Sequence, residues 1–148
     1  MYKDTITLFV RKPAKTGDTW TPIVLTGVDL NADRGAIIAQ YGAESKDTAK
    51  LHIKYAVNDT GAIVINGYVY IPPKEYARLT STAGHITFAS GNDFCFFIEG
   101  LWPNSNIIND TDYTDGFYNY MNSQYDHCYA ITSAARYSVI PHFEVLAK

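Results

Sequence analysis

Three aspartates lie close together in a polar stretch, at Asp110, Asp112 and Asp115. Alternating carboxylates of this kind can wrap a hard cation such as Ca²⁺. The calcium loop of an EF-hand, however, needs a glycine at its sixth position and a bidentate glutamate at its twelfth. Counted from Asp110, Gly116 stands at the seventh position and Met121 at the twelfth. The sequence therefore predicts a turn-rich segment here and no metal site.

The histidines and cysteines form one short cluster, Asp126-His127-Cys128. A nucleophilic cysteine needs a histidine beside its sulfur, but adjacent residues of a strand point to opposite faces. The other histidines, His52, His85 and His142, stand at no recognised ligand spacing from one another or from a cysteine. We therefore expect structural roles for His127 and Cys128.

Known catalytic motifs are absent from the chain. It contains no Gly-x-Gly-x-x-Gly, no Walker A and no Gly-x-Ser-x-Gly pattern. Of its four glutamates, only Glu75 and Glu99 lie centrally, which leaves few candidates for a paired-carboxylate hydrolase. The sequence therefore predicts a protein that is not an enzyme, with no catalytic residue, no cofactor and no bound metal. Pairs of catalytic residues that are far apart in the sequence and that only the fold would bring together are not excluded.

Residues 103–127 break the pattern of the rest of the chain. They hold five Asn, four Asp and four Tyr without sustained alternation, which predicts a long loop insertion. Its large apolar and aromatic side chains would gain from burial, and a neighbouring subunit or partner could provide it. We expect these residues to contribute to an interface and not to the core: Ile107, Ile108, Tyr113, Phe117, Tyr118, Tyr120 and Tyr125.

A second interpretation of residues 103–127 stays open. Aromatic planes and amides in one loop also suit a surface that binds a sugar or a peptide. Tyr and Phe are equally enriched, and charge depleted, in contacts between proteins. Composition does not separate the two.

The elements around these residues alternate with period two and are punctuated by Gly, Asn, Asp and Pro. Asn66-Gly67 within residues 62–71 predicts a hairpin with a type I′ turn. A second hairpin is expected between residues 85–89 and 94–99, the latter strand being buried on both sides. Residues 137–146 read as one strand that Pro141 interrupts at an edge or bulge.

A single all-β domain over residues 1–148 follows from this pattern. About eight short strands and one short helix at residues 73–80, after Pro73, are expected. An open sheet of that size would leave unpaired edges, so the strands should close into a small β-barrel or a two-sheet sandwich, the barrel being the first choice.

Charge and composition exclude several classes of protein. Twelve basic and 15 acidic residues give a net charge of −3, too little basic charge for tight binding to DNA phosphates. No apolar run approaches the ~20 residues of a transmembrane helix, and the chain begins without a signal-peptide pattern. Cys95 and Cys128 are too few for a disulfide framework and should pack as small apolar residues. We expect a chain made in the cytoplasm.

The order of the elements resembles that of small head-completion or head–tail connector proteins of tailed bacteriophages, often labelled minor capsid proteins. The features that carry the resemblance span most of the chain. They are the N-terminal strand at residues 2–9, Trp20, and residues 24–28, 72–76, 84–100 and 142–145. Residues 103–127 look like an enlargement of the usual connection.

This resemblance implies a structural virion protein of the neck. Such a protein forms a homo-oligomeric ring of six or twelve copies, with portal or adaptor proteins above it and tail-terminator or tail proteins below it. DNA passes through the ring without specific binding, and no membrane is involved. The alternative is a β-sandwich binding module, for a glycan or a peptide, in the tail or another virion position.

Overall fold

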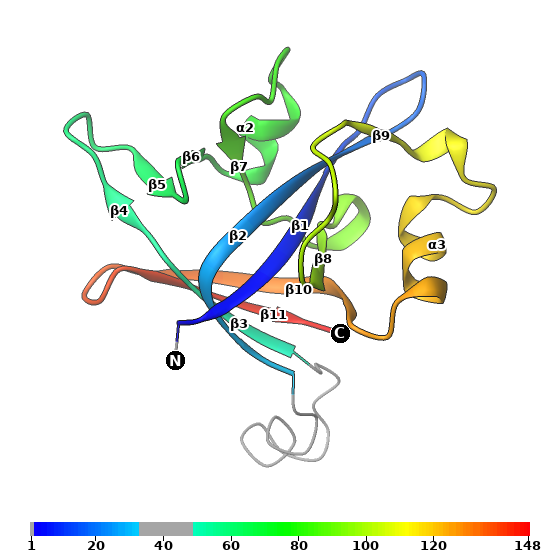
Figure 1. Ribbon diagram of the computed structural model, residues 1–148. Helices are drawn as coiled ribbons and strands as arrows, with labels where there is room; N and C mark the ends of the chain where they lie inside the picture. The colour runs from blue at the N-terminus through cyan, green and yellow to red at the C-terminus, as the bar shows by residue number, and fades with distance from the viewer. Residues whose placement is uncertain (1, 33–48) are drawn as a thin grey trace.

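The computed structural model describes residues 2–32 and 49–148. Six antiparallel strands close into a barrel in the order β1-β8-β10-β11-β3-β2, because β2 pairs again with β1 (Figure 1). This confirms the predicted all-β fold and selects the barrel over the sandwich. The barrel strands are β1 (Asp4–Lys12), β2 (Thr19–Asn31), β3 (Ala49–Lys54), β8 (Phe96–Glu99), β10 (Cys128–Tyr137) and β11 (His142–Ala147).

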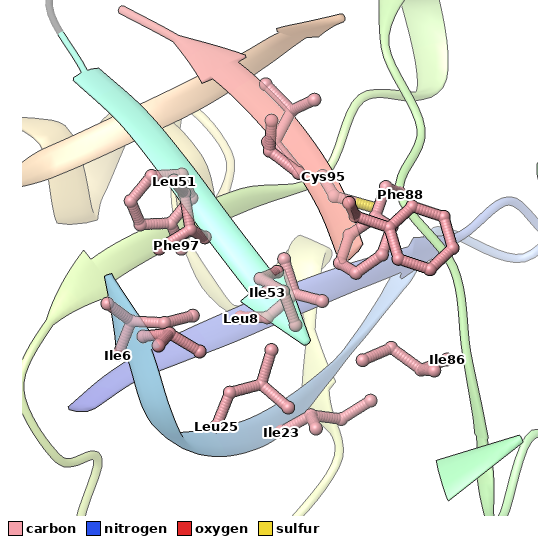
Figure 2. Packing of buried hydrophobic residues seen from close by; sticks show 14 of the residues in the cluster. Ile6, Leu8, Ile23, Leu25, Leu51, Ile53, Ile86, Phe88, Cys95 and Phe97 are labelled. Atoms are coloured by element: carbon pink, nitrogen blue, oxygen red, sulfur yellow. The ribbon is translucent and has the colours of Figure 1, made fainter. Parts of the chain in front are cut away.

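Alternation along the strands decides which side chains fill the barrel. Ile6, Leu8 and Val10 of β1 are fully buried in its interior. Figure 2 shows Leu8 converging there with Leu25 of β2 and Ile53 of β3. Burying such side chains contributes roughly 1.5–3 kcal/mol each relative to exposure. A closed barrel with an apolar interior is therefore the stable frame of the chain.

Residues 55–89 cover one end of this barrel. A small sheet orders its strands β4-β5-β6-β7, with β6 and β7 parallel, and the helix α2 lies between these two strands in the chain. The bounds are β4 (Ala56–Val57), β5 (Ile63–Ile65), β6 (Tyr68–Tyr70), α2 (Pro73–Ala77) and β7 (His85–Ile86). Ile65, Tyr76 and Ile86 join the barrel core, and α2, which begins at Pro73, confirms the predicted short helix.

The Asn66-Gly67 hairpin is confirmed between β5 and β6. Both turn residues have positive φ, 49° at Asn66 and 85° at Gly67, as a type I′ turn requires. The Asn66 side chain also fastens the hairpin to the barrel. Its Oδ1 accepts hydrogen bonds from the backbone and hydroxyl of Thr26, at 3.2 and 3.0 Å, and its amide donates to the Thr26 carbonyl.

Replacing Gly67 by Val should lower the free energy of unfolding by about 1 kcal/mol or more, because a β-branched residue resists positive φ. A Cβ at this position would meet no atom within 4 Å, so strain and not a clash is the cause. The midpoint of urea denaturation measures the effect. Gly67→Asn is the control, since Asn tolerates this conformation and should cost much less; equal midpoints for Val and glycine would contradict the account.

Two of the expected features, a hairpin and an interrupted strand, are wrong. β7 pairs with β6, and β8 lies between β1 and β10 in the barrel, so residues 85–89 and 94–99 form no hairpin. The apolar residues on both faces of β8 suit that central position, as predicted. Residues 137–146 are not one interrupted strand either. Pro141, which has no N–H for a ladder, ends the turn between β10 and β11.

The expected loop at residues 103–127 contains regular structure that the sequence analysis missed. It holds β9 (Ile108–Asn109), which pairs with the start of β2, the 3₁₀ turn η2 (Asp110–Asp112) and the helix α3 (Phe117–Gln124). A second 3₁₀ turn, η1 (Gly91–Asp93), precedes β8. In the part of the chain that the structure describes, no helix has the length and apolar character needed to span a bilayer.

Candidate functional site

Residues 100–125, hereafter the outer segment, lie against the outside of the barrel. Phe9 and Phe96 point outward from β1 and β8, and their rings stack at 4.9 Å. Phe117 and Met121 of α3 cover them and are fully buried. Figure 1 shows α3 beside the barrel, on the side opposite the turn that joins β10 to β11. The outer segment therefore has a second apolar layer beneath it.

This layer changes the interpretation of the expected interface residues. Phe117 is wholly buried in its own chain, with its ring 5.1 Å from that of Phe9, so it is a core residue and not an interface residue. Tyr118 is half-buried against Phe94 and Phe96. The segment obtains much of its burial by folding back on the barrel. The expectation that residues 103–127 stand outside the core is wrong for Phe117 and for the face of α3 that it shares with Met121.

Some of the expected interface residues do face solvent. Ile107 is 60% exposed, and Tyr120 and Tyr125 are exposed by 44% and 43%. Ile108 and Tyr113 are half-buried. Leu101, which the sequence analysis did not single out, is 71% exposed. We call Leu101, Ile107, Tyr120 and Tyr125 the segment surface.

Asp110 fixes the outer segment to the barrel. Its Oδ1 accepts hydrogen bonds from the Trp20 indole N–H at 2.8 Å and from the Phe117 backbone N–H, at the start of α3, at 2.9 Å. Its own N–H donates to the Asp18 carbonyl. The carboxylate that resembled the first ligand of a calcium loop thus ties β2 to the helix N-terminus, where negative charge is favourable.

We expect Asp110→Ala to lower the free energy of unfolding by about 2–3 kcal/mol, because two charge-assisted hydrogen bonds are lost and the buried Trp20 N–H is left without an acceptor. Asp112→Ala is the matched control. Asp112 is exposed in the same turn, so its removal should change stability by less than about 0.5 kcal/mol. Urea denaturation compares the two, and equal effects would contradict the anchoring role of Asp110.

The two cysteines are buried, as predicted. Cys95 lies in the barrel interior and Cys128 in the outer aromatic layer. Burial raises the pKa of Cys95 to about 11 and that of Cys128 to about 12, so both stay protonated near neutral pH. His127 is turned away, with Nδ1 3.2 Å from the Tyr129 hydroxyl and 3.7 Å from Glu99. Cys128 therefore has no geometry for nucleophilic catalysis with His127.

A second exposed apolar surface lies at the turn between β10 and β11. Val139 is 96% and Ile140 73% exposed, and we call this pair the hairpin tip. The second half of β10, from Ser133 to Tyr137, is exposed as well, so the hairpin projects beyond the barrel (Figure 1). Isolated exposed apolar residues are ordinary, but two adjacent ones at a projecting tip suit insertion into a partner.

One polar cluster on the barrel contains residues from strands that are distant in the sequence. The spacing of these residues along the chain gave no sign that they would meet. His52 of β3 and Glu144 of β11 are 92 residues apart, yet His52 Nε2 lies 3.0 Å from Glu144 Oε1. Lys50 Nζ is 3.1 Å from the same oxygen. Burial disfavours the charged carboxylate, but hydrogen bonds from Lys50 and His52 and the charge of Lys50 outweigh it and hold the pKa of Glu144 at about 2.

The architecture defines a class of protein: a small closed six-stranded barrel with a capped end, an outer aromatic layer, and exposed apolar or aromatic side chains at the hairpin tip and on the outer segment. The chain belongs to the family DUF6751, described as a family of unknown function, which matches residues 1–148. No curated protein and no solved structure matches the chain.

Proposed function

We propose that this chain is a structural virion protein of a tailed bacteriophage, a subunit of the neck ring that completes the head and joins it to the tail. The observation that carries the proposal is the separation of two exposed apolar surfaces. The hairpin tip and the helix α3, which carries Tyr120, lie on opposite sides of the barrel (Figure 1). A ring of identical subunits needs two such different surfaces, because each head-to-tail contact joins unlike patches.

In this proposal Val139 and Ile140 of one subunit dock against the segment surface of the next. Tyr120 and Tyr125 supply aromatic side chains of the kind enriched at interface centres. Val139 and Ile140 supply the aliphatic anchors. The number of copies is six or twelve, as in the connector proteins that the chain resembles. Portal or adaptor proteins lie above the ring and tail-terminator or tail proteins below it.

The charge of the chain supports passage of DNA without binding. Residues 101–148 carry two basic residues, Arg136 and Lys148, against five acidic ones. Tight binding to DNA relies on neutralising phosphates with Lys and Arg, so a wall of this composition offers little attraction. A channel that does not hold DNA lets it leave the head.

The alternative is a barrel that serves as a glycan- or peptide-binding module at another virion position. It is favoured by a hollow of about 390 Å³ on the outer segment. Tyr113 and Tyr120 line it with Asp112, Asp115 and Asn119, a combination of aromatic planes and hydrogen-bonding groups that suits a sugar.

Three observations distinguish these functions: the neighbouring genes, the content of purified particles and binding to glycans. Genes on either side of this one should encode a portal and tail-completion proteins, and mass spectrometry of purified particles should find the chain at six or twelve copies. Genes for metabolism on both sides, together with particles that lack the chain, would contradict the neck proposal. Binding to a glycan array that Tyr120→Ala abolishes would support the alternative instead.

A further inference from the structure

Three barrel strands, β2, β3 and β11, place a row of polar side chains on the outer face, next to the hairpin tip. Register sets Asp29 of β2 opposite His52 of β3, and His52 opposite Glu144 of β11. His142 precedes Glu144 by two residues on the same strand and so shares its face. Directly opposite residues on one face have Cβ atoms about 4.5–5.5 Å apart. The fold thus brings two imidazoles and a carboxylate together.

The distances among these groups approach those of a metal site. One ligand atom from each of His52, His142 and Glu144 lies within 4.8 Å of the others. His142 Nε2 is 3.9 Å from Glu144 Oε2, and the two imidazole centroids are 5.7 Å apart. With metal–ligand bonds of about 2.0–2.2 Å, small changes of side-chain torsion would let the three atoms reach one ion.

Each imidazole has an acceptor on the side away from Glu144, at hydrogen-bond distance for His142 and at ion-pair distance for His52. His142 Nδ1 is 2.6 Å from the Ile140 carbonyl, which can only accept, so Nδ1 carries the proton and Nε2 of the neutral ring keeps its lone pair. His52 Nδ1 lies 3.7 Å from Asp29 Oδ2. A ligating histidine commonly donates its other ring N–H to a carbonyl or carboxylate, as His142 does to Ile140. The Nε2 atoms of both rings face Glu144, and His52 Nε2 donates to Glu144 Oε1, so a metal ion that binds there displaces this proton.

We propose that His52, His142 and Glu144 form a binding site for a divalent first-row transition metal ion, with Zn²⁺ as its test ligand. Two nitrogens and one carboxylate are donors that Zn²⁺ favours, whereas Ca²⁺ and Mg²⁺ favour oxygen alone. The three side chains are 19–24% exposed, so an ion can enter from solvent and a water can complete its coordination. This site is independent of the neck proposal and revises the expectation of no metal.

Lys50 competes with the metal ion. Its ammonium lies 3.1 Å from Glu144 Oε1 and would repel a divalent cation there. The flexible stem of Lys50 lets the charged end swing away when the ion binds. Replacing Lys50 by Met keeps the apolar stem and removes the charge, so it should tighten binding, an effect that a simple ion-pair network would not produce.

Titration calorimetry with Zn²⁺, repeated with Co²⁺ by visible absorption, tests the site on the full chain. We expect one equivalent to bind. His52→Ala and His142→Ala should each weaken binding by roughly tenfold or more, and Lys50→Met should strengthen it several-fold. His127→Ala is the matched control, because His127 also faces a carboxylate, Glu99, but has no second imidazole there.

Circular dichroism confirms that each variant is folded, which the surface position of the residues favours. Failure of the wild-type chain to bind Zn²⁺ or Co²⁺ below millimolar concentration would overturn the proposal. So would binding that the His52→Ala/His142→Ala double variant retains in full. Loss of binding in His127→Ala alone would place the ion elsewhere and equally overturn it.

Discussion

Phe117→Ala is expected to lower the free energy of unfolding by about 3–5 kcal/mol, the cost of removing a large aromatic side chain from a core. Phe117 is fully buried, and its ring contacts those of Phe9, Phe96 and Trp102. Its loss leaves a cavity between α3 and the barrel. Urea denaturation followed by tryptophan fluorescence measures the change, since Trp20 and Trp102 both lie in this layer.

Tyr120→Ala is the control, because Tyr120 lies on the same helix but is exposed. It should change stability by about 0.5 kcal/mol or less. Deleting residues 103–127 should be worse than either change, because it uncovers Phe9, Trp20 and Phe96. A deletion variant as stable as the full chain, or equal effects of Phe117→Ala and Tyr120→Ala, would show that the outer segment is not part of the core.

The double change Val139→Asp/Ile140→Asp is expected to block assembly while leaving the isolated chain folded. Val139 is almost fully exposed and Ile140 is 73% exposed, so the change costs the monomer little. In a ring, each tip would bury two charges against an apolar surface. A central contact of this kind is worth about 2 kcal/mol or more, a factor of roughly 30 in affinity, at every junction around the ring.

Incorporation of the variant chain into particles, measured by mass spectrometry after complementation of a strain that lacks the gene, tests this expectation. Val57→Asp is the matched control. Val57 is 59% exposed but lies in β4, outside both proposed contact surfaces, so this variant should be incorporated normally. Normal incorporation of the double variant, or equal loss for Val57→Asp, would contradict the role of the hairpin tip.

Local sequence patterns predicted the β-barrel and one hairpin of this protein correctly. Period-two alternation and the Asn66-Gly67 turn are properties of neighbouring residues, and the barrel and the first hairpin followed from them. The double-sided burial of β8 was also visible in its continuous apolar run. In contrast, α3 has few strong helix formers, and its Asn, Tyr and Ser residues resemble a loop. Packing of Phe117 and Met121 on the barrel outweighs that weak propensity.

The contacts of Asp110 and those of the His52–Glu144 cluster join residues that are far apart in the sequence. Residue spacing could not predict them. Asp110 accepts a hydrogen bond from Trp20 across 90 residues, and this contact makes an aspartate of a predicted turn-rich segment an anchor. His52 and Glu144 meet only because β3 pairs with β11 in one register. A shift of one residue would place either side chain in the barrel interior. Sequence patterns indicate which residues face outward, and strand order decides which of them meet.

A reconstruction of the particle neck by electron cryomicroscopy tests the central claim most directly. The account predicts a closed ring of six or twelve copies between portal and tail, with Val139 and Ile140 of each subunit buried against Tyr120 and Tyr125 of the next. A ring with the hairpin tip in solvent would contradict the proposed contact. A particle whose neck is complete without this chain would contradict the proposed function itself.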